Sequence, residues 1–464
     1  MIDPTLNYFF LSLLLGPPAA YKSRMKRNDM DQSLRTAVNF CCVTAAIAAL
    51  VPAASAQVAN LESAPSNFFE DAHQESLAKY LGLGPISVRP HLYVSAYFDD
   101  NLALKDGGSV PLPGSREDNE MEDFVWRISP GALFGMGEFR DKGNYVTLDY
   151  TPTINLYTKY HDFNSLDHKL DFNAGWKLSK LTLGFGQSYE NASGKQVEVA
   201  GFVQQKTYTT LLTSLYEFSD KTSAELNGRQ MIMRSEEQFI GSNLPDDELT
   251  SVNQWEIEGW GNYKQSEKLT LGVGATVGWR DISDDGAQEN IVDTPNQTFQ
   301  QVSVRAAYEV SEKVDVSGSV GLFFSQFQDG DDESPTLVFN LEGSWQPLEN
   351  TYVSGEVYRR DVPSLSQTAQ NYTATGFRAS VRQVFAEKYS ASLAGGFENT
   401  DYSSAGPGGV NRNDDYLWFR PSLNYQFNER INAGVFCFYR TKNSNADGAD
   451  FSNKQIGVFS NYRF

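Results

Sequence analysis

Charged side chains recur at every second position in many segments of this sequence, and they are its most evident candidates for chemistry. Glu342, Glu356 and Arg378, for example, fall on three successive segments that have this alternation. Period-two spacing places the charges of a strand on one face, and that face must meet water because hydrocarbon disfavours charge. We interpret the charged face as a selectivity site, in which opposing carboxylates and guanidinium groups orient small polar solutes. Its proposed members are Arg305, Glu342, Glu356, Arg360, Arg378, Arg382 and Arg420.

The same charges allow a second interpretation, in which they pair with one another and only stiffen the wall. Opposite charges on neighbouring strands form such ladders, here from Glu342 and Glu356 to Arg378 and Arg382. The polar face also carries aromatic residues, which either stack against sugars or pack within the wall. These are Tyr358, Tyr416 and Trp418.

Residues that could hold a metal ion or catalyse a reaction are few. There are only four His, and the sequence has no P-loop, no G-x-S-x-G and no Cys/His cluster. His161-Asp162 and Asp167-His168 are the only pairs that invite comparison with a barrel hydrolase. We therefore expect no enzyme activity and no cofactor. Calcium candidates occur in one acidic run, Asp329, Asp331, Asp332 and Glu333, although its spacing is not that of an EF-hand loop.

The elements that carry these residues are predicted to be strands. From residue 88 onwards we count eighteen alternating segments, joined in turn by short turns such as 311–313 and by longer loops rich in Gly, Asp, Asn and Pro, such as 191–202. This rhythm is typical of a transmembrane antiparallel up-and-down β-barrel, here with about 18 strands (16–18). Short periplasmic turns and long extracellular loops are expected. Backbone groups in hydrocarbon all need partners, so the sheet must close.

Aromatic residues precede the short turns, which supports the barrel independently. They share the parity of each strand's apolar face, as a girdle at a membrane interface requires. The girdle is predicted at Trp176, Phe218, Tyr263, Tyr308, Trp345, Phe385, Phe427 and Phe464. The chain ends on Phe464, and a terminal Phe after an alternating strand resembles the signal that the barrel-assembly machinery recognises.

The first 56 residues contain the pattern of a targeting signal. Basic residues follow Met25, an apolar run spans 37–50, and Ala54-Ser55-Ala56 forms an A-x-A cleavage site. We predict a signal peptide cleaved after Ala56, with a start at Met25 or Met1. Residues 1–56 then form an over-extended start plus the signal, 57–87 a short periplasmic segment and 88–464 the barrel.

Composition excludes several classes of protein. The chain of 464 residues has 58 Asp plus Glu against 38 Lys plus Arg, a net charge of −20. Nucleic acid is excluded as a partner because its phosphates need a basic surface. Since charges of both signs balance on the predicted inner face, the acidity must lie mainly in the long loops. An acidic rim favours the passage of cations.

One segment resembles a known family. Pro90-x-x-Tyr93 and Tyr97-Phe98-Asp99-Asp100-Asn101-Leu102 are similar to the first-strand "Y-D-D-N" segment of the second family of outer-membrane β-barrel porins. Its relatives include proteins encoded with exopolysaccharide gene clusters, and Phe98 stands where the family often has Tyr. The resemblance implies a porin-type barrel, with a possible link to polysaccharide export. From the residues alone we expect Asp99 and Asn101 to shape a turn.

The sequence thus predicts a porin-like channel, integral to the outer membrane, for passive passage of small hydrophilic solutes with a preference for cations. The alternatives are a conduit for exopolysaccharide export and a closed surface barrel with adhesive or structural loops. The expected partners are outer-membrane lipid and lipopolysaccharide, the barrel-assembly machinery, and small polar solutes or polysaccharide.

Overall fold

The structure is a computed structural model, and all its described residues lie in one compact unit of the chain, Ile47–Phe464. The described residues are 81–83, 86–105, 121–137, 144–239, 249–284, 296–327, 335–365, 371–403, 412–446 and 448–463.

Eighteen long strands and one short strand make up almost all of this structure. Their bounds are β1 Leu81–Leu83, β2 Ile86–Asp99, β3 Asp123–Gly137, β4 Tyr145–Tyr157, β5 Ser165–Lys177, β6 Leu181–Gln196, β7 Gly201–Ser219, β8 Thr222–Phe239, β9 Thr250–Lys264, β10 Leu269–Asp284, β11 Gln297–Ser311, β12 Val314–Phe327, β13 Thr336–Leu348, β14 Thr351–Pro363, β15 Asn371–Phe385, β16 Tyr389–Ser403, β17 Arg412–Gln426, β18 Ile431–Ser444 and β19 Phe451–Arg463.

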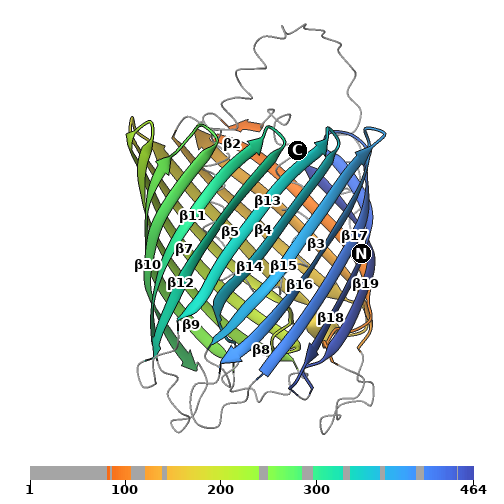
Figure 1. Cartoon of the computed structure of the whole chain (residues 1–464). Coiled ribbons are helices and arrows are strands. Elements are labelled where there is room, and N and C mark those ends of the chain that lie inside the picture. Colours follow the sequence, from red (N-terminus) through yellow and green to blue (C-terminus); the bar gives the residue numbers. More distant parts are fainter. Residues whose placement is uncertain are drawn as a thin grey trace, which may run out of the picture. The chain divides into compact units, whose positions relative to one another are not determined.

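Each long strand pairs antiparallel with the next, and the last pairs with the first. The β19–β2 register runs from Gln455 opposite Asp99 to Arg463 opposite His91. The sheet is therefore a closed barrel of eighteen strands, which confirms the predicted fold class (Figure 1). The short β1 pairs with residues 86–88 of β2, beyond the point where β19 ends. β2 itself begins at Ile86, two residues before the expected boundary of the barrel.

The period-two alternation decides which side chains face outwards. On β13, Leu337, Leu341 and Trp345 are exposed on the outer face, whereas Val338 between them is buried on the inner face. The other strands repeat this pattern, so the outer face exposes many large apolar side chains. A barrel that exposes its apolar side suits a surrounding solvent of hydrocarbon.

The connections divide the barrel into two ends. We call the end with the turns at 220–221, 312–313 and 349–350 the short-turn end, and the opposite end, which holds residues 158–164 and 197–200, the long-loop end. The predicted short turns lie at the first end, together with the start of β2 and the end of β19 (Figure 1). Among the described residues, no helix is long and apolar enough to cross a membrane.

One predicted loop is wrong. Residues 191–202 were expected to form a long loop, but β6 continues to Gln196 and β7 begins at Gly201, so the turn contains only residues 197–200. The physical reason is burial, because this segment packs inside the barrel, where ladder hydrogen bonds satisfy its backbone.

Candidate functional site

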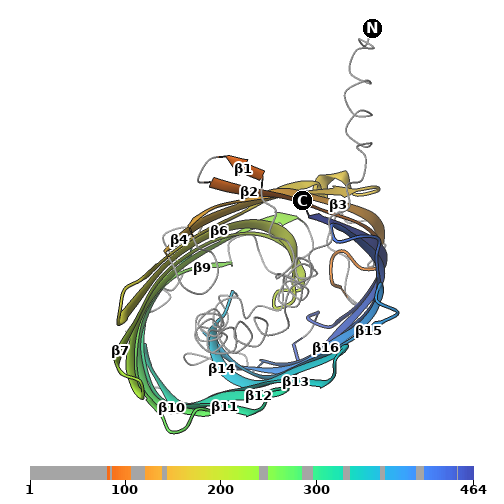
Figure 2. The same cartoon turned by 90° about the horizontal axis from the view of Figure 1, so that it is seen from above.

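The tip of the β6–β7 hairpin lies inside the barrel, near the long-loop end. Val199, Phe202 and Val203 are all buried, and Glu198 contacts Ser364 after β14, on the far side of the lumen. A contact between such distant strands is possible only across the concave face of the sheet. Figure 2 looks along the barrel and shows the end of β14 also turned inwards. The two hairpin ends therefore meet within the lumen.

An ion pair anchors the β6–β7 tip to the first strand of the barrel. Lys195 Nζ bonds to Asp99 Oδ2, with both side chains almost fully buried, and also donates to the carbonyl of Asn101 at 3.1 Å. Asp99 Oδ1 accepts the Asn101 backbone N–H at 3.0 Å, which confirms the expected turn. The segment that resembles the porin family thus has a second role, which sequence reasoning missed: it holds the tip in place.

Glu198 is the residue at which the β6–β7 tip contacts the end of β14. One carboxylate oxygen accepts hydrogen bonds from Ser364 Oγ at 2.5 Å and from the Leu365 backbone N–H at 3.0 Å. The Glu198 backbone carbonyl accepts from Arg412 at 2.5 Å and from Lys442 at 3.2 Å. The Glu198 side chain is buried, and burial raises the pKa of this carboxyl above its usual range.

The charges around Glu198 balance. Asp414 pairs with Arg412 at 2.5 Å and lies 3.6 Å from Lys442, so two cations face the Glu198 and Asp414 carboxylates. Buried charges persist when they are paired and hydrogen-bonded in this way. The junction is therefore a compact, neutral cluster built from three hairpins.

The end of β14 leans into the lumen because it leaves its neighbour early. β13 pairs with β14 only as far as Arg359, although β14 continues to Pro363. Beyond that point Leu365 is fully buried against Met231, Met233 and Val252 of β8 and β9, together with Val199 and Val203 of the other tip. Apolar packing from the opposite wall thus holds the inward end of β14.

A salt bridge fixes the same end of β14 to β10. Arg280 Nη1 bonds to Asp361 Oδ1 at 2.7 Å, and Arg280 also donates to Gln254 at 2.7 Å and Gln297 at 2.8 Å. β11, β12 and β13 lie between the two strands, so this bridge crosses part of the lumen.

Several arginines of the inner wall lie over aromatic rings, and two of these rings lie against glycines. The guanidinium carbon of Arg305 is 4.3 Å from the centre of the Trp260 ring, and a β-carbon on Gly274 would lie only 2.4 Å from that ring. Arg360 lies over Tyr358 at 4.2 Å in the same way, with Gly376 behind the phenol. Stacking of this kind holds cations close to the wall.

The seven residues predicted for selectivity all lie on strands, but they do not form one ladder. Glu342 stands opposite Glu356, which stands opposite Arg378, and Arg378 Nε bonds to Glu356. Glu342 instead accepts from Ser317 Oγ at 2.7 Å. Arg382 stands opposite Tyr352, outside this cluster.

The remaining predicted arginines each have a different partner. Arg305 bonds to Glu225 at 2.6 Å, Arg360 bonds to Glu398 at 3.2 Å, and Arg420 lies 4.9 Å from the Phe436 ring. These partners lie on other strands, so the alternation within one strand could not predict the pairs.

Charges of opposite sign gather on different parts of the inner wall in the described structure. Carboxylates predominate on β5–β9 and guanidinium groups predominate on β14–β18. The carboxylates include Asp167, Asp171, Glu190, Glu225, Glu256 and Glu258, and the guanidinium groups include those of Arg360, Arg378, Arg382, Arg412, Arg420 and Arg440.

The inward aromatic residues are covered rather than open to the lumen. Tyr358 is 6% exposed, Tyr416 3% and Trp418 7%. Tyr358 also donates its hydroxyl to Glu398 at 2.7 Å. Packing within the wall therefore describes these rings better than a surface for stacking sugars.

The predicted girdle residues occupy the outer face beside the short turns. Seven of them are exposed: Trp176, Phe218, Tyr263, Tyr308, Trp345, Phe385 and Phe427. Phe464 lies outside the described residues. A second group of outward aromatics lies nearer the long-loop end, where Trp255 and Trp279 stack with ring centres 6.0 Å apart.

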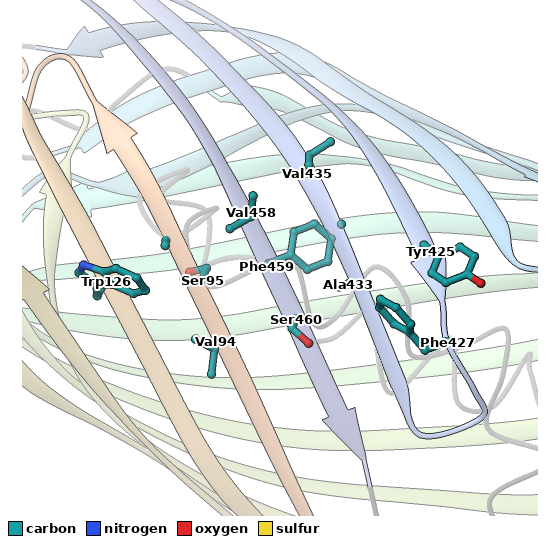
Figure 3. A pocket seen from close by; sticks show the side chains of 12 residues that line it. Val94, Ser95, Trp126, Tyr425, Phe427, Ala433, Val435, Val458, Phe459 and Ser460 are labelled. Carbon is teal, nitrogen blue, oxygen red and sulfur yellow. The ribbon is translucent and has the colours of Figure 1, made fainter.

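The outer face also carries a shallow groove at the seam between β2 and β19. The residues that line it include Trp126, Phe427, Ala433, Val458 and Ser460 (Figure 3). The groove is apolar and faces away from the lumen, so it is no part of the polar site inside.

The described structure does not bring the candidate catalytic residues Asp167 and His168 together. The calcium candidates Asp329, Asp331, Asp332 and Glu333 lie outside the described residues, and among the described ones no cluster could hold a metal ion. Asp167 contacts Asn155 on the inner face at 2.7 Å, whereas His168 contacts Tyr150 at 2.9 Å on the exposed outer face. They therefore point to opposite sides of the wall.

Comparison with known proteins gives likeness in structure only. The sequence matches no model of a known protein family and no curated protein. The siderophore receptor PirA from Pseudomonas aeruginosa is 10% identical, with 81% of this chain and 80% of that chain covered and a TM-score of 0.41. The outer membrane protein opdK from Pseudomonas aeruginosa is 10% identical, with 82% and 99% covered and a TM-score of 0.41. The FrpB iron transporter from Neisseria meningitidis, in its apoprotein form, is 10% identical, with 84% and 82% covered and a TM-score of 0.43. At these scores the likeness carries no argument about function.

Proposed function

We propose that this protein is a porin-like channel of an outer membrane, through which small hydrophilic solutes diffuse. The observation that carries the proposal is a closed barrel of eighteen strands, apolar outside and charged inside, with two hairpin ends that narrow its lumen. A barrel of this strand number is wide enough for an aqueous lumen.

The outer aromatic groups support the location in a membrane. Trp255 and Tyr263 are both exposed on β9, eight positions apart. Eight residues span about 26 Å of strand, which corresponds to about 20 Å of height at a tilt near 40°. The apolar band of outer-membrane barrels is about 25 Å tall, so these residues suit its two interfaces.

The inner wall supports passage of polar solutes. Between the junction and the short-turn end, β12 and β13 present Ser317, Ser319, Asn340 and Ser344 to the lumen. Small polar side chains leave room for water, and the unlike charges of β5–β9 and β14–β18 create a field across it. Selectivity would then depend on Arg305, Glu342, Glu356, Arg360, Arg378, Arg382 and Arg420.

A preference for cations is part of the proposal, and it rests on the net charge of −20. The acidic runs that would form the rim, including Asp329 to Glu333, fall outside the described residues. The signal peptide up to Ala56 and the assembly signal at Phe464 fall outside them too, and they remain predictions.

A second candidate is a closed surface barrel. The meeting of the two hairpin ends favours it, because a permanent junction would block the lumen. The polysaccharide conduit has less support, since the inward rings of Tyr358, Tyr416 and Trp418 are covered.

The test is single-channel recording with the purified protein in a planar lipid bilayer under a KCl gradient. We expect discrete open events and a reversal potential of the sign that cation selectivity gives. A barrel that is folded but silent in every recording would favour the closed surface barrel, and an anion-selective potential would remove the acidic rim from the proposal.

A further inference from the structure

We propose that the junction of the β6–β7 and β14–β15 hairpins is a latch, and that the lumen opens when Glu198 leaves Ser364 and Leu365. The inference rests on the proposed channel function, and it adds a means of regulation to the same site. Its starting point is the position of Glu198, a buried carboxylate at which three separate hairpins meet.

The Glu198 side chain joins the β6–β7 tip to the end of β14. Ser364 Oγ and the Leu365 backbone N–H both donate to its carboxylate. Strand pairing, by contrast, holds each hairpin to its own neighbours along many residues. Loss of the Glu198 carboxylate would therefore weaken the junction, where the apolar packing of Leu365 against Val199 and Val203 remains, and would leave both hairpins folded.

The β6–β7 tip also carries backbone strain. Ala200 has a φ of +48°, a left-handed conformation that costs a residue with a β-carbon about 1–2 kcal/mol. Strain of this kind persists only where the surroundings impose it, and it concentrates at switch regions. Ala200 is buried in the apolar cluster that contains Leu102 and Phe202, at the base of the junction.

The base of the tip is fixed more firmly than its end. Lys195 is tied to Asp99 within a buried network that also contains Asn453 and Gln455. Arg412 and Lys442 also bond to the backbone carbonyls of Glu198 and Val197, so these two residues keep their backbone positions. The movement is therefore confined to the Glu198 side chain and residues 199–200.

The latch can be tested without measuring current, by cysteine accessibility. Cys437 is the only cysteine in the described residues and is exposed on the outer face, so C437S gives a suitable background. The reaction rate of V199C then shows whether the β6–β7 tip is buried at the junction, because Val199 is buried and makes none of the Glu198 hydrogen bonds. S354C, on the exposed inner face of β14, is the matched control for access of the reagent to the lumen. A membrane-impermeant methanethiosulfonate is the probe, with the protein in lipid nanodiscs.

We expect V199C to react much more slowly than S354C. E198A should raise its rate about tenfold, the factor expected when hydrogen bonds worth about 1–1.5 kcal/mol are lost. E198Q keeps an acceptor for Ser364 and Leu365 and should leave the rate within about twofold. S364A removes one donor and should give an intermediate rate, which keeps the test valid if E198A does not fold.

Two results would overturn the latch: V199C reacting as fast as S354C with Glu198 intact, or no acceleration in E198A and S364A. A different result would contradict the proposed channel function and leave the latch intact. If E198A exposes V199C but no variant conducts, the latch exists in a barrel that is not a channel.

Discussion

The Trp260 ring lies directly over Gly274, so that a β-carbon on this glycine would be 2.4 Å from the ring. Arg305 also stacks on this ring, and its guanidinium group bonds to Glu225. The absence of a side chain at Gly274 therefore leaves the space that the Trp260 ring occupies, and the ring in turn holds Arg305 close to the wall. We expect G274A to displace both and to destabilise the barrel by about 1–3 kcal/mol, the usual cost of overpacking.

The measurement for G274A is the midpoint of denaturant unfolding in detergent micelles. Gly261 on β9 offers a matched control, because a β-carbon there meets nothing within 4 Å. G261A should leave the midpoint unchanged. Equal midpoints for G274A and the unaltered protein would show that the ring does not depend on the glycine.

A second prediction concerns the anchor of the β6–β7 tip. D99N leaves the buried Lys195 ammonium without its carboxylate, and removing one partner of a buried pair costs about 3–5 kcal/mol. K195M should cost less, because Asp99 keeps bonds from Asn453 at 2.7 Å and Gln455 at 2.8 Å. Thermal unfolding followed by gel mobility compares the two. A larger loss in K195M would contradict the assignment.

A third prediction concerns pH. Burial raises the pKa of the Glu198 carboxyl, so the closed junction favours its protonated form. The resulting stabilisation of the closed junction is fully present at pH values below the ordinary pKa of Glu, and it is lost as the pH rises through the raised pKa. The rate of V199C modification should therefore increase with pH relative to S354C. In E198Q the ratio should not change with pH. The ionisable groups that face Glu198 are Arg412 and Asp414 of β17, Lys442 of β18, Tyr372 of β15 and Tyr402 of β16.

A rising ratio in E198Q would assign the pH response to another of these groups. A flat ratio in the protein with Glu198 intact would show that its ionisation does not act on the junction.

A fourth prediction concerns charge selectivity. Arg378 and Arg382 lie on the inner face of β15, so R378E/R382E should move the reversal potential further towards cations while the barrel stays folded. K454E is the control, because Lys454 is exposed on the outer face of β19. Its potential should not change. Failure of R378E/R382E to fold would mean that Arg378 and Glu356 serve mainly as a structural pair.

The alternation in the sequence was sufficient to predict all eighteen long strands. Each outward position is apolar because it faces the membrane, so the alternation on β13 or β17 can be recognised from that segment of the sequence alone. The short turns were equally visible because Ser, Asp and Lys interrupt the alternation at regular intervals.

The junction could not be predicted in the same way. Glu198 and Leu365 meet across the lumen although 166 residues separate Glu198 from Ser364. Sequence reasoning treated 191–202 as a polar loop, yet Val197, Val199, Phe202 and Val203 form an apolar run around a single glutamate. That composition is typical of a buried segment and was the one available signal. Which wall it would pack against depends on closure of the barrel, which no local pattern contains.

The neutrality of the junction has a consequence for the whole lumen. Because Glu198 and Asp414 balance Arg412 and Lys442, movement of the tips changes the free cross-section but leaves the field along the pore nearly unaltered. Arg378 and Arg382 act at a different height, nearer the short-turn end of β15. Size exclusion and charge discrimination are thus separate functions of this barrel, and mutations should be able to change either one without the other.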